Sequence, residues 1–164
     1  MTRMRQHGFT IVELLIVIVV IGILAAITIV AFNGVQDRGK AAAKVSDIKA
    51  MQKIIELYYA DKGTYPNTGN SWRFQRAVGN DFIPGVVPEF TSKLPEITDG
   101  PTGSTSNNTY IYRSNTAGTE YKLMRLYQAS VPLGEYNNIP ASMRDQNASL
   151  TDRWGVWSPG GTTI

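Results

Sequence analysis

A run of 23 residues without a charged side chain, from residue 14 to residue 36, constrains this chain more than any other feature. Glu13 precedes the run and Asp37 follows it. As a helix, the run would extend roughly 35 Å at about 1.5 Å per residue, whereas the hydrocarbon core of a bilayer is roughly 30 Å thick. The sequence therefore predicts a helix long enough to span a membrane, with a single carboxylate at its beginning.

Basic residues before the run indicate its orientation. Arg3 and Arg5 lie on the N-terminal side, while the charges that follow Gln36 have mixed signs. Because positive charge is enriched on the cytoplasmic side of a span, we expect residues 1–8 in the cytoplasm and the rest of the chain across the membrane. The segment is not an ordinary secretory signal, whose small-residue cleavage site follows the apolar region. Here the small residue, Gly8, precedes it.

Composition limits the chemistry of the remaining chain. There is no cysteine, which excludes disulfides, thiol catalysis and cysteine-ligated zinc. The one histidine, His7, lies before the apolar run, so no histidine triad or histidine metal site remains after it. Without Arg3 and Arg5, the net charge of +3 falls to about +1, from 14 basic and 13 acidic side chains. The rest of the chain is nearly neutral in charge and offers no general phosphate-binding field. Nucleic acid is therefore an unsupported partner. We also expect no enzymatic activity.

The helical pattern continues beyond the apolar run. No proline occurs before Pro66, and apolar residues recur every three or four positions between charged ones. Gly63 is a natural helix stop, and Pro66 cannot continue a helix, so we expect the helix to end near residues 61–62. The apolar positions of this second, amphipathic half are Val45, Ile48, Met51, Ile55 and Tyr58.

The remaining sequence predicts a small antiparallel sheet. Residues 110–112 alternate aromatic and β-branched side chains, residues 115–118 indicate a turn, and residues 121–127 alternate again, which together predict a hairpin. A last strand is expected at residues 153–157. A small sheet with one apolar face is stable only when another element packs on that face. We expect the amphipathic face of residues 41–62 to be that element.

Other parts of the head are less regular in pattern. Residues 72–78, preceded by possible caps, and residues 88–94 are expected to form short helices. Residues 128–152 carry too little periodicity for a prediction. Trp154 and Trp157 are expected to pack on the sheet, with a binding surface as the alternative.

Three segments resemble a known family. The sequence Gly8-Phe9-Thr10-Ile11-Val12-Glu13, the later segment 22–27 and the segment 58–66 are similar to the N-terminal signature of type IV pilins and of the pseudopilins of type II secretion and DNA-uptake systems. Segments 87–95 and 110–123 resemble the linker and first strands of the smaller heads in that family. The resemblance implies the type IV pilin fold, an α+β architecture in which a long N-terminal helix packs on a small antiparallel sheet.

The resemblance also implies a processing site and an assembly site. A prepilin peptidase would cut after Gly8, and the new amino-terminus, Phe9, would be N-methylated. Glu13 matches the buried glutamate of the family. A lone carboxylate in an apolar span is costly and usually meets a partner, here the Phe9 amine of a neighbouring copy, which would specify register more than add stability. A glutamate lying idle at the headgroups is the alternative.

These inferences divide the chain into four parts. We expect a leader at residues 1–8, a transmembrane and filament-core helix at 9–36, an amphipathic helix at 37–63 and a globular head at 64–164. The expected partners are copies of the chain itself in a helical polymer or a pilus with minor pilins, the prepilin peptidase, an inner-membrane assembly platform, and membrane lipid before assembly.

The expected function is that of a type IV pilus subunit for adhesion, twitching motility or DNA uptake. It would be a single-pass membrane protein with a cytoplasmic N-terminus before assembly, and part of an extracellular pilus afterwards. One alternative is a pseudopilin of a type II secretion system, and another is a monomeric membrane-anchored adhesin or binding domain. No cofactor or metal is predicted, because the acidic residues weighed for a calcium loop lack an oxygen-ligand spacing: Asp99, Glu135, Asp145 and Asp152.

Overall fold

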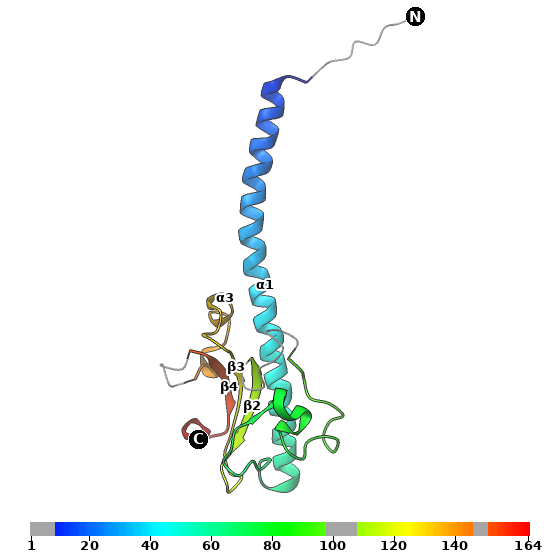
Figure 1. Ribbon diagram of the computed structural model, residues 1–164, viewed down its shortest axis with the longest axis vertical. Helices are drawn as coiled ribbons and strands as arrows, with labels where there is room; N and C mark the ends of the chain where they lie inside the picture. The colour runs from blue at the N-terminus through cyan, green and yellow to red at the C-terminus, as the bar shows by residue number, and fades with distance from the viewer. Residues whose placement is uncertain (1–8, 98–107, 146–150) are drawn as a thin grey trace, which may run out of the picture.

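The computed structural model describes residues 9–97, 108–145 and 151–164. Helix α1 runs unbroken over Ile11–Lys62, 52 residues, and therefore extends about 78 Å. It ends where Gly63 adopts a left-handed conformation with φ +74°, and the Gly63 N–H donates to the Tyr59 carbonyl at 2.8 Å. The predicted helix and its end are thus confirmed (Figure 1).

The head contains a four-stranded antiparallel sheet in the order β1-β2-β3-β4. Strands β2 and β3 form the predicted hairpin, with Ser114 opposite Tyr121, and β4 is the predicted last strand. The fold class expected from the sequence is confirmed. The strand bounds are Arg73–Phe74 for β1, Thr109–Ser114 for β2, Tyr121–Leu126 for β3 and Arg153–Trp157 for β4.

Both predicted short helices need correction. Of residues 72–78, only Gln75–Val78 form a helix, α2, because the two residues before it pair with β2 as the edge strand β1. Residues 88–94 contain no helix: a turn covers residues 87–90, and the chain after it is irregular. The Phe90 and Thr91 N–H groups both donate to the Val86 carbonyl, which closes the chain into a turn at that point.

Short elements connect the strands. Helix α3 spans Leu133–Tyr136, and 3₁₀ turns occupy Gly79–Phe82, Ala141–Met143 and Gly161–Thr163. All of these elements lie around the sheet, at the level of the C-terminal half of α1 (Figure 1). The sequence pattern predicted neither α3 nor the 3₁₀ turns.

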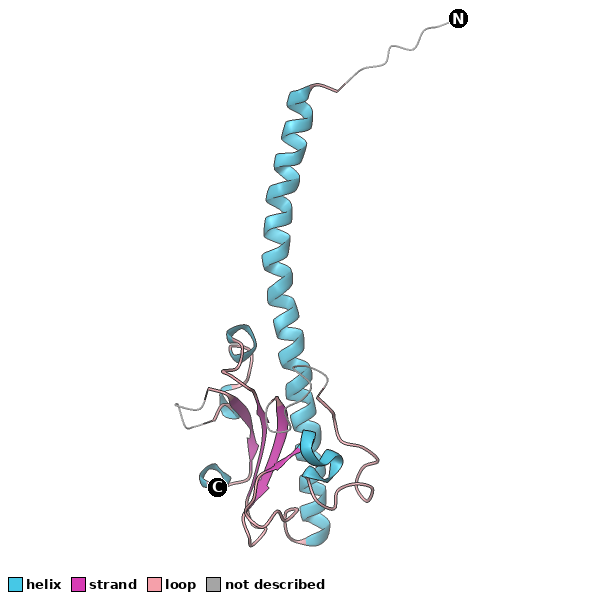
Figure 2. Cartoon of the chain, viewed as in Figure 1, coloured by secondary structure: helices cyan, strands magenta, loops and turns pink. Residues whose placement is uncertain are grey.

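The core lies between α1 and the sheet. Figure 2 shows the C-terminal half of α1 running along the sheet, while the N-terminal half extends beyond the head. Ile48, Met51 and Ile55 are fully buried there and pack in one cluster with residues of β2 and β3, among them Tyr112 and Leu123. The amphipathic face is therefore the cover that the sheet was expected to need. Trp154 is also fully buried in this cluster, as expected for packing on the sheet.

A group of tyrosines closes the far end of this core. The hydroxyls of Tyr65 and Tyr121 donate to the two carboxylate oxygens of Glu56, at 3.3 and 3.0 Å. The ring of Tyr65 stacks on Tyr59 at 4.4 Å and meets Tyr121 edge-on at 4.6 Å. Burial raises the pKa of Tyr65 to about 12. The helix end is therefore fixed to the sheet by aromatic packing.

Candidate functional site

Helix α1 begins at a capping box. Thr10 is the N-cap residue, and the Glu13 N–H donates to its hydroxyl at 3.2 Å. In return, Glu13 Oε2 accepts from the Thr10 N–H at 2.8 Å and from the Thr10 hydroxyl at 2.7 Å. This arrangement satisfies donors that a helix N-terminus otherwise leaves unpaired. The Glu13 carboxylate is thereby held in one orientation at the end of the helix.

The structure brings two of the three predicted site residues into one helical turn. Phe9 directly precedes the N-cap residue and is 84% exposed, and Glu13 lies within the first turn. Gly8, the third, lies outside the described residues. Sequence reasoning missed the part played by Thr10, although a threonine followed three positions later by glutamate is the signature of a capping box.

The apolar half of α1 has no cover in the single chain. The helix is long and apolar enough to cross a membrane, and the head buries none of its most apolar stretch. The leucine, isoleucine and valine side chains that the structure describes between Ile11 and Val35 are exposed all round, not along one stripe. A helix that is apolar on every side needs lipid or other apolar helices around it. The candidate site therefore consists of the first turn of α1, which carries the ionisable Glu13. It lies at the end of an apolar helix that needs lipid or other helices to bury it.

A second polar cluster lies inside the head. Lys44 on α1 donates to Glu135 on α3 at 2.7 Å, and both side chains are mostly buried. The Tyr127 hydroxyl also donates to Glu135, and the Trp154 indole N–H donates to the Tyr127 oxygen at 3.3 Å. Burial, followed by the hydrogen bond to Glu135, raises the pKa of Tyr127 to about 12. This cluster joins α1, α3, β4 and the segment that follows β3, and sequence reasoning did not find it.

The acidic residues weighed for a calcium loop have separate cationic partners. Glu135 pairs with Lys44, Asp145 lies 3.6 Å from Lys122, and Asp152 pairs with Arg153 at 2.8 Å. Asp99 lies outside the described residues. Within the part of the chain that the structure describes, no three acidic or histidine side chains gather to hold a metal ion.

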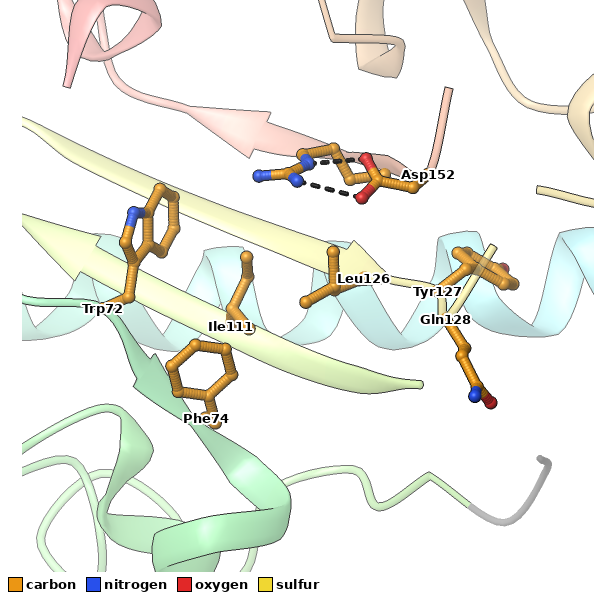
Figure 3. A pocket seen from close by; sticks show the side chains of 8 residues that line it. Trp72, Phe74, Ile111, Leu126, Tyr127, Gln128 and Asp152 are labelled. Atoms are coloured by element: carbon orange, nitrogen blue, oxygen red, sulfur yellow. Dashed lines mark hydrogen bonds and ion pairs between the residues drawn. The ribbon is translucent and has the colours of Figure 1, made fainter. Parts of the chain in front are cut away.

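A shallow hollow of about 330 Å³ lies on the sheet (Figure 3). Its apolar wall includes Trp72, Phe74, Ile111 and Leu126, which pack together as a small second cluster. At the rim, the guanidinium of Arg153 donates to both carboxylate oxygens of Asp152, at 2.8 and 2.9 Å. The charged groups of the rim thus pair with each other.

Comparison with known families finds the N-terminal motif. The profile of the family described as "Prokaryotic N-terminal methylation motif" matches residues 3–29. The matched segment contains Gly8, Phe9, Glu13 and most of the apolar half of α1.

The similar proteins include components of two systems. Type II secretion system core protein G is 38% identical in Klebsiella michiganensis and 37% identical in Pseudomonas aeruginosa, in each case over 68 residues that cover 42% of this chain and 48% of the relative. The type IV major pilin protein PilA of Myxococcus xanthus is 36% identical over 78 residues, which cover 48% of this chain and 36% of the pilin.

The matches therefore span about half the length, or less, of these curated relatives. No solved structure matches the chain significantly. The names of these relatives denote secretion-system and pilus components, not enzymes. The resemblance to the N-terminal signature is confirmed: the chain carries the N-terminal methylation motif and is similar, over 68 to 78 residues, to a type II secretion system core protein and to a type IV major pilin.

Proposed function

We propose that this chain is the precursor of a type IV pilus subunit, anchored in the membrane by α1 and then assembled with its own copies into an extracellular filament. The observation that carries this proposal is the uncovered apolar half of α1 with Glu13 at its tip. A bilayer can surround such a rod before assembly, and neighbouring rods can surround it afterwards. Adhesion, twitching motility or DNA uptake would follow from the filament.

Processing would create the charge that Glu13 meets. Cleavage after Gly8 by a prepilin peptidase would leave a cationic amine on Phe9, which would then be N-methylated. Side-by-side helices offset by one or two turns, about 5 to 11 Å, would bring this amine close to Glu13 of a neighbouring copy. In this proposal, residues 1–8 are the leader, 9–36 the span and filament core, 37–63 the amphipathic helix and 64–164 the head.

The charge of Glu13 can be tested separately from its capping role. Glutamine at position 13 can still accept hydrogen bonds from Thr10, but it cannot form an ion pair. We expect Glu13→Gln and Glu13→Ala to insert and to be cleaved normally, and both to yield few filaments. Thr10→Val, which removes the N-cap hydroxyl and keeps the carboxylate, is the matched control and should assemble better than Glu13→Gln. Normal filament yield from Glu13→Gln would refute the role assigned to the charge.

Processing has its own test. A bulky residue at Gly8 should leave an uncleaved precursor, which the mass of the intact protein would reveal. A mature protein that begins at Met1 in the unaltered chain would contradict the proposal. The assumed partners in this step are the peptidase and an inner-membrane assembly platform, with the N-terminus on the cytoplasmic side.

A pseudopilin of a type II secretion system is the second candidate. The observation in its favour is the similarity to type II secretion system core protein G. Electron microscopy of shed surface filaments, with peptide identification, separates the two: filaments made of this chain favour the pilus. Accumulation of unsecreted exoproteins after deletion of the gene would favour the pseudopilin. A mature protein that stays monomeric in the membrane beside an intact assembly machinery would instead favour an anchored adhesin.

A further inference from the structure

Helix α3 lies against α1 at the position where the apolar run ends. A side chain at Gly134 would collide with the carboxylate of Asp37, the first charged residue after the run, so the backbone of α3 touches the helix at that level. In Figure 1, α3 is the part of the head nearest to the apolar half of α1. The head therefore reaches up to the edge of the membrane-spanning segment through α3.

The buried polar cluster fixes α3 at this height. Glu135 in α3 accepts hydrogen bonds from Lys44 on α1 and from Tyr127, which follows β3. Within α3, the N–H groups of Glu135 and Tyr136 both donate to the Pro132 carbonyl, at 2.9 and 2.8 Å. A charged pair with additional hydrogen bonds has a specific geometry, so the short helix is held in one position on α1.

Leu133, the first residue of α3, is mostly exposed although Glu135 of the same short helix is buried. It is 74% exposed, whereas Val78, the other exposed large apolar residue described after α1, is 42% exposed. A single exposed leucine needs no explanation on an ordinary surface. This one lies in the short helix whose next residue touches Asp37, and the exposed cations Arg38 and Lys40 follow at the same level of α1.

The length of α1 places that level at the membrane surface. Residues 9–36 as a helix extend about 42 Å, and a bilayer with its headgroup regions is about 40–45 Å thick. With the beginning of the helix at one surface, Asp37 lies in the headgroup layer of the opposite surface. Leucine side chains enter the boundary between headgroups and acyl chains favourably, and basic side chains are attracted to anionic headgroups.

We propose that α3 is a second membrane contact: while the chain is anchored, Leu133 inserts among the headgroups of the outer leaflet, with Arg38 and Lys40 beside it at the lipid phosphates. The occupant is the bilayer surface itself. This inference rests on the proposed span of residues 9–36 and does not depend on polymerisation. It gives the head a fixed height and rotation on the membrane instead of free movement at the end of a stalk.

Single-cysteine labelling tests the proposal, because the chain has no cysteine of its own. The full chain carrying Leu133→Cys, labelled with an environment-sensitive fluorophore, is placed in vesicles of phosphatidylethanolamine and phosphatidylglycerol. Quenching by a lipid spin-labelled near the headgroup is compared with quenching by aqueous iodide. Val78→Cys is the matched control, an exposed apolar position on another short helix, and Leu24→Cys reports the span.

Each outcome decides one claim. We expect the label at position 133 to be quenched by the spin-labelled lipid and largely protected from iodide, and the label at position 78 to show the reverse. Iodide quenching at 133 as strong as at 78, with position 24 protected, would overturn the inference and leave the span intact. An aqueous label at position 24 would overturn the span and this inference with it. Leu133→Cys should fold, since its side chain is mostly exposed, and unchanged thermal unfolding confirms this.

Discussion

Replacing Lys44 by methionine should destabilise the head by about 3–5 kcal/mol. The substitution keeps most of the apolar stem but removes the ammonium group that lies 2.7 Å from Glu135 Oε2. Glu135 is 7% exposed in its side chain, so its charge would remain buried with the Tyr127 hydroxyl as its remaining donor among the contacts described above. Removal of one partner from a buried ion pair costs about 3–5 kcal/mol for this reason.

The double variant shows whether the buried charge is the cause. In Lys44→Met combined with Glu135→Leu, both members of the ion pair are replaced by neutral side chains, and the Tyr127 hydroxyl loses its acceptor. One unsatisfied buried hydroxyl costs about 1–3 kcal/mol. We therefore expect the double variant to be more stable than Lys44→Met alone.

Urea unfolding of the full chain in detergent measures these differences. Tryptophan fluorescence is a suitable signal, because Trp154 is fully buried and hydrogen-bonded to Tyr127 in the same cluster. Equal slopes of the free energy against urea would show that the variants expose the same surface on unfolding. A cost below about 1 kcal/mol for Lys44→Met, as for a pair on the surface, would refute the reasoning.

Three further predictions concern the core and the sheet. The free energy of unfolding should fall steeply above pH 10, because the unfolded chain loses phenolic protons that the folded chain retains, at about 1.4 kcal/mol per pH unit for each tyrosine. Unfolding midpoints measured between pH 8 and 12 would check this. The four tyrosines whose pKa is raised mainly by burial are Tyr65, Tyr112, Tyr121 and Tyr127. Gly155→Ala should cost about 1–3 kcal/mol, since its Cβ would overlap the Leu123 carbonyl oxygen in the neighbouring strand, and an unchanged melting temperature would contradict this. Ile55→Ala should cost about 2–5 kcal/mol by opening a cavity under the sheet, whereas Leu57→Ala, at a half-exposed position on the same helix, should cost far less in the same urea assay.

The elements that the sequence predicted are those specified by local patterns. The uninterrupted apolar run and the amphipathic periodicity predicted α1, and Gly63 predicted where it ends. Alternation on both sides of a turn predicted the β2–β3 hairpin. Strand β1 was missed because it has two residues, and its pairing of Phe74 with Ile111 joins segments far apart in the chain. Helix α3 depends on a contact between Glu135 and Lys44, 91 residues apart. No local pattern carries such information.

The same distinction holds for the candidate site. Glu13 is visible in the sequence as a single charge at the beginning of an apolar run, whereas the role of Phe9 was predicted from the resemblance of residues 8–13 to the pilin signature. The distances between Glu13 and Thr10 needed the structure, although their spacing was a readable signal. The cluster around Glu135 joins four elements, so neither its members nor its consequence for Leu133 could be derived from neighbouring residues.

In the proposed assembly scheme, the capping box explains how a carboxylate can lie in an apolar helix before it meets the amine of a neighbouring copy. A charged side chain without hydrogen bonds would be expensive at the edge of the hydrocarbon region. In the single chain, Glu13 Oε2 already accepts two hydrogen bonds from Thr10, and the helix macrodipole favours negative charge in the first turn. Both effects lower the cost of keeping the carboxylate ionised during anchoring. A neighbouring amine then has only to reach a group that is charged and oriented, so assembly exchanges one set of partners for another instead of burying a new charge.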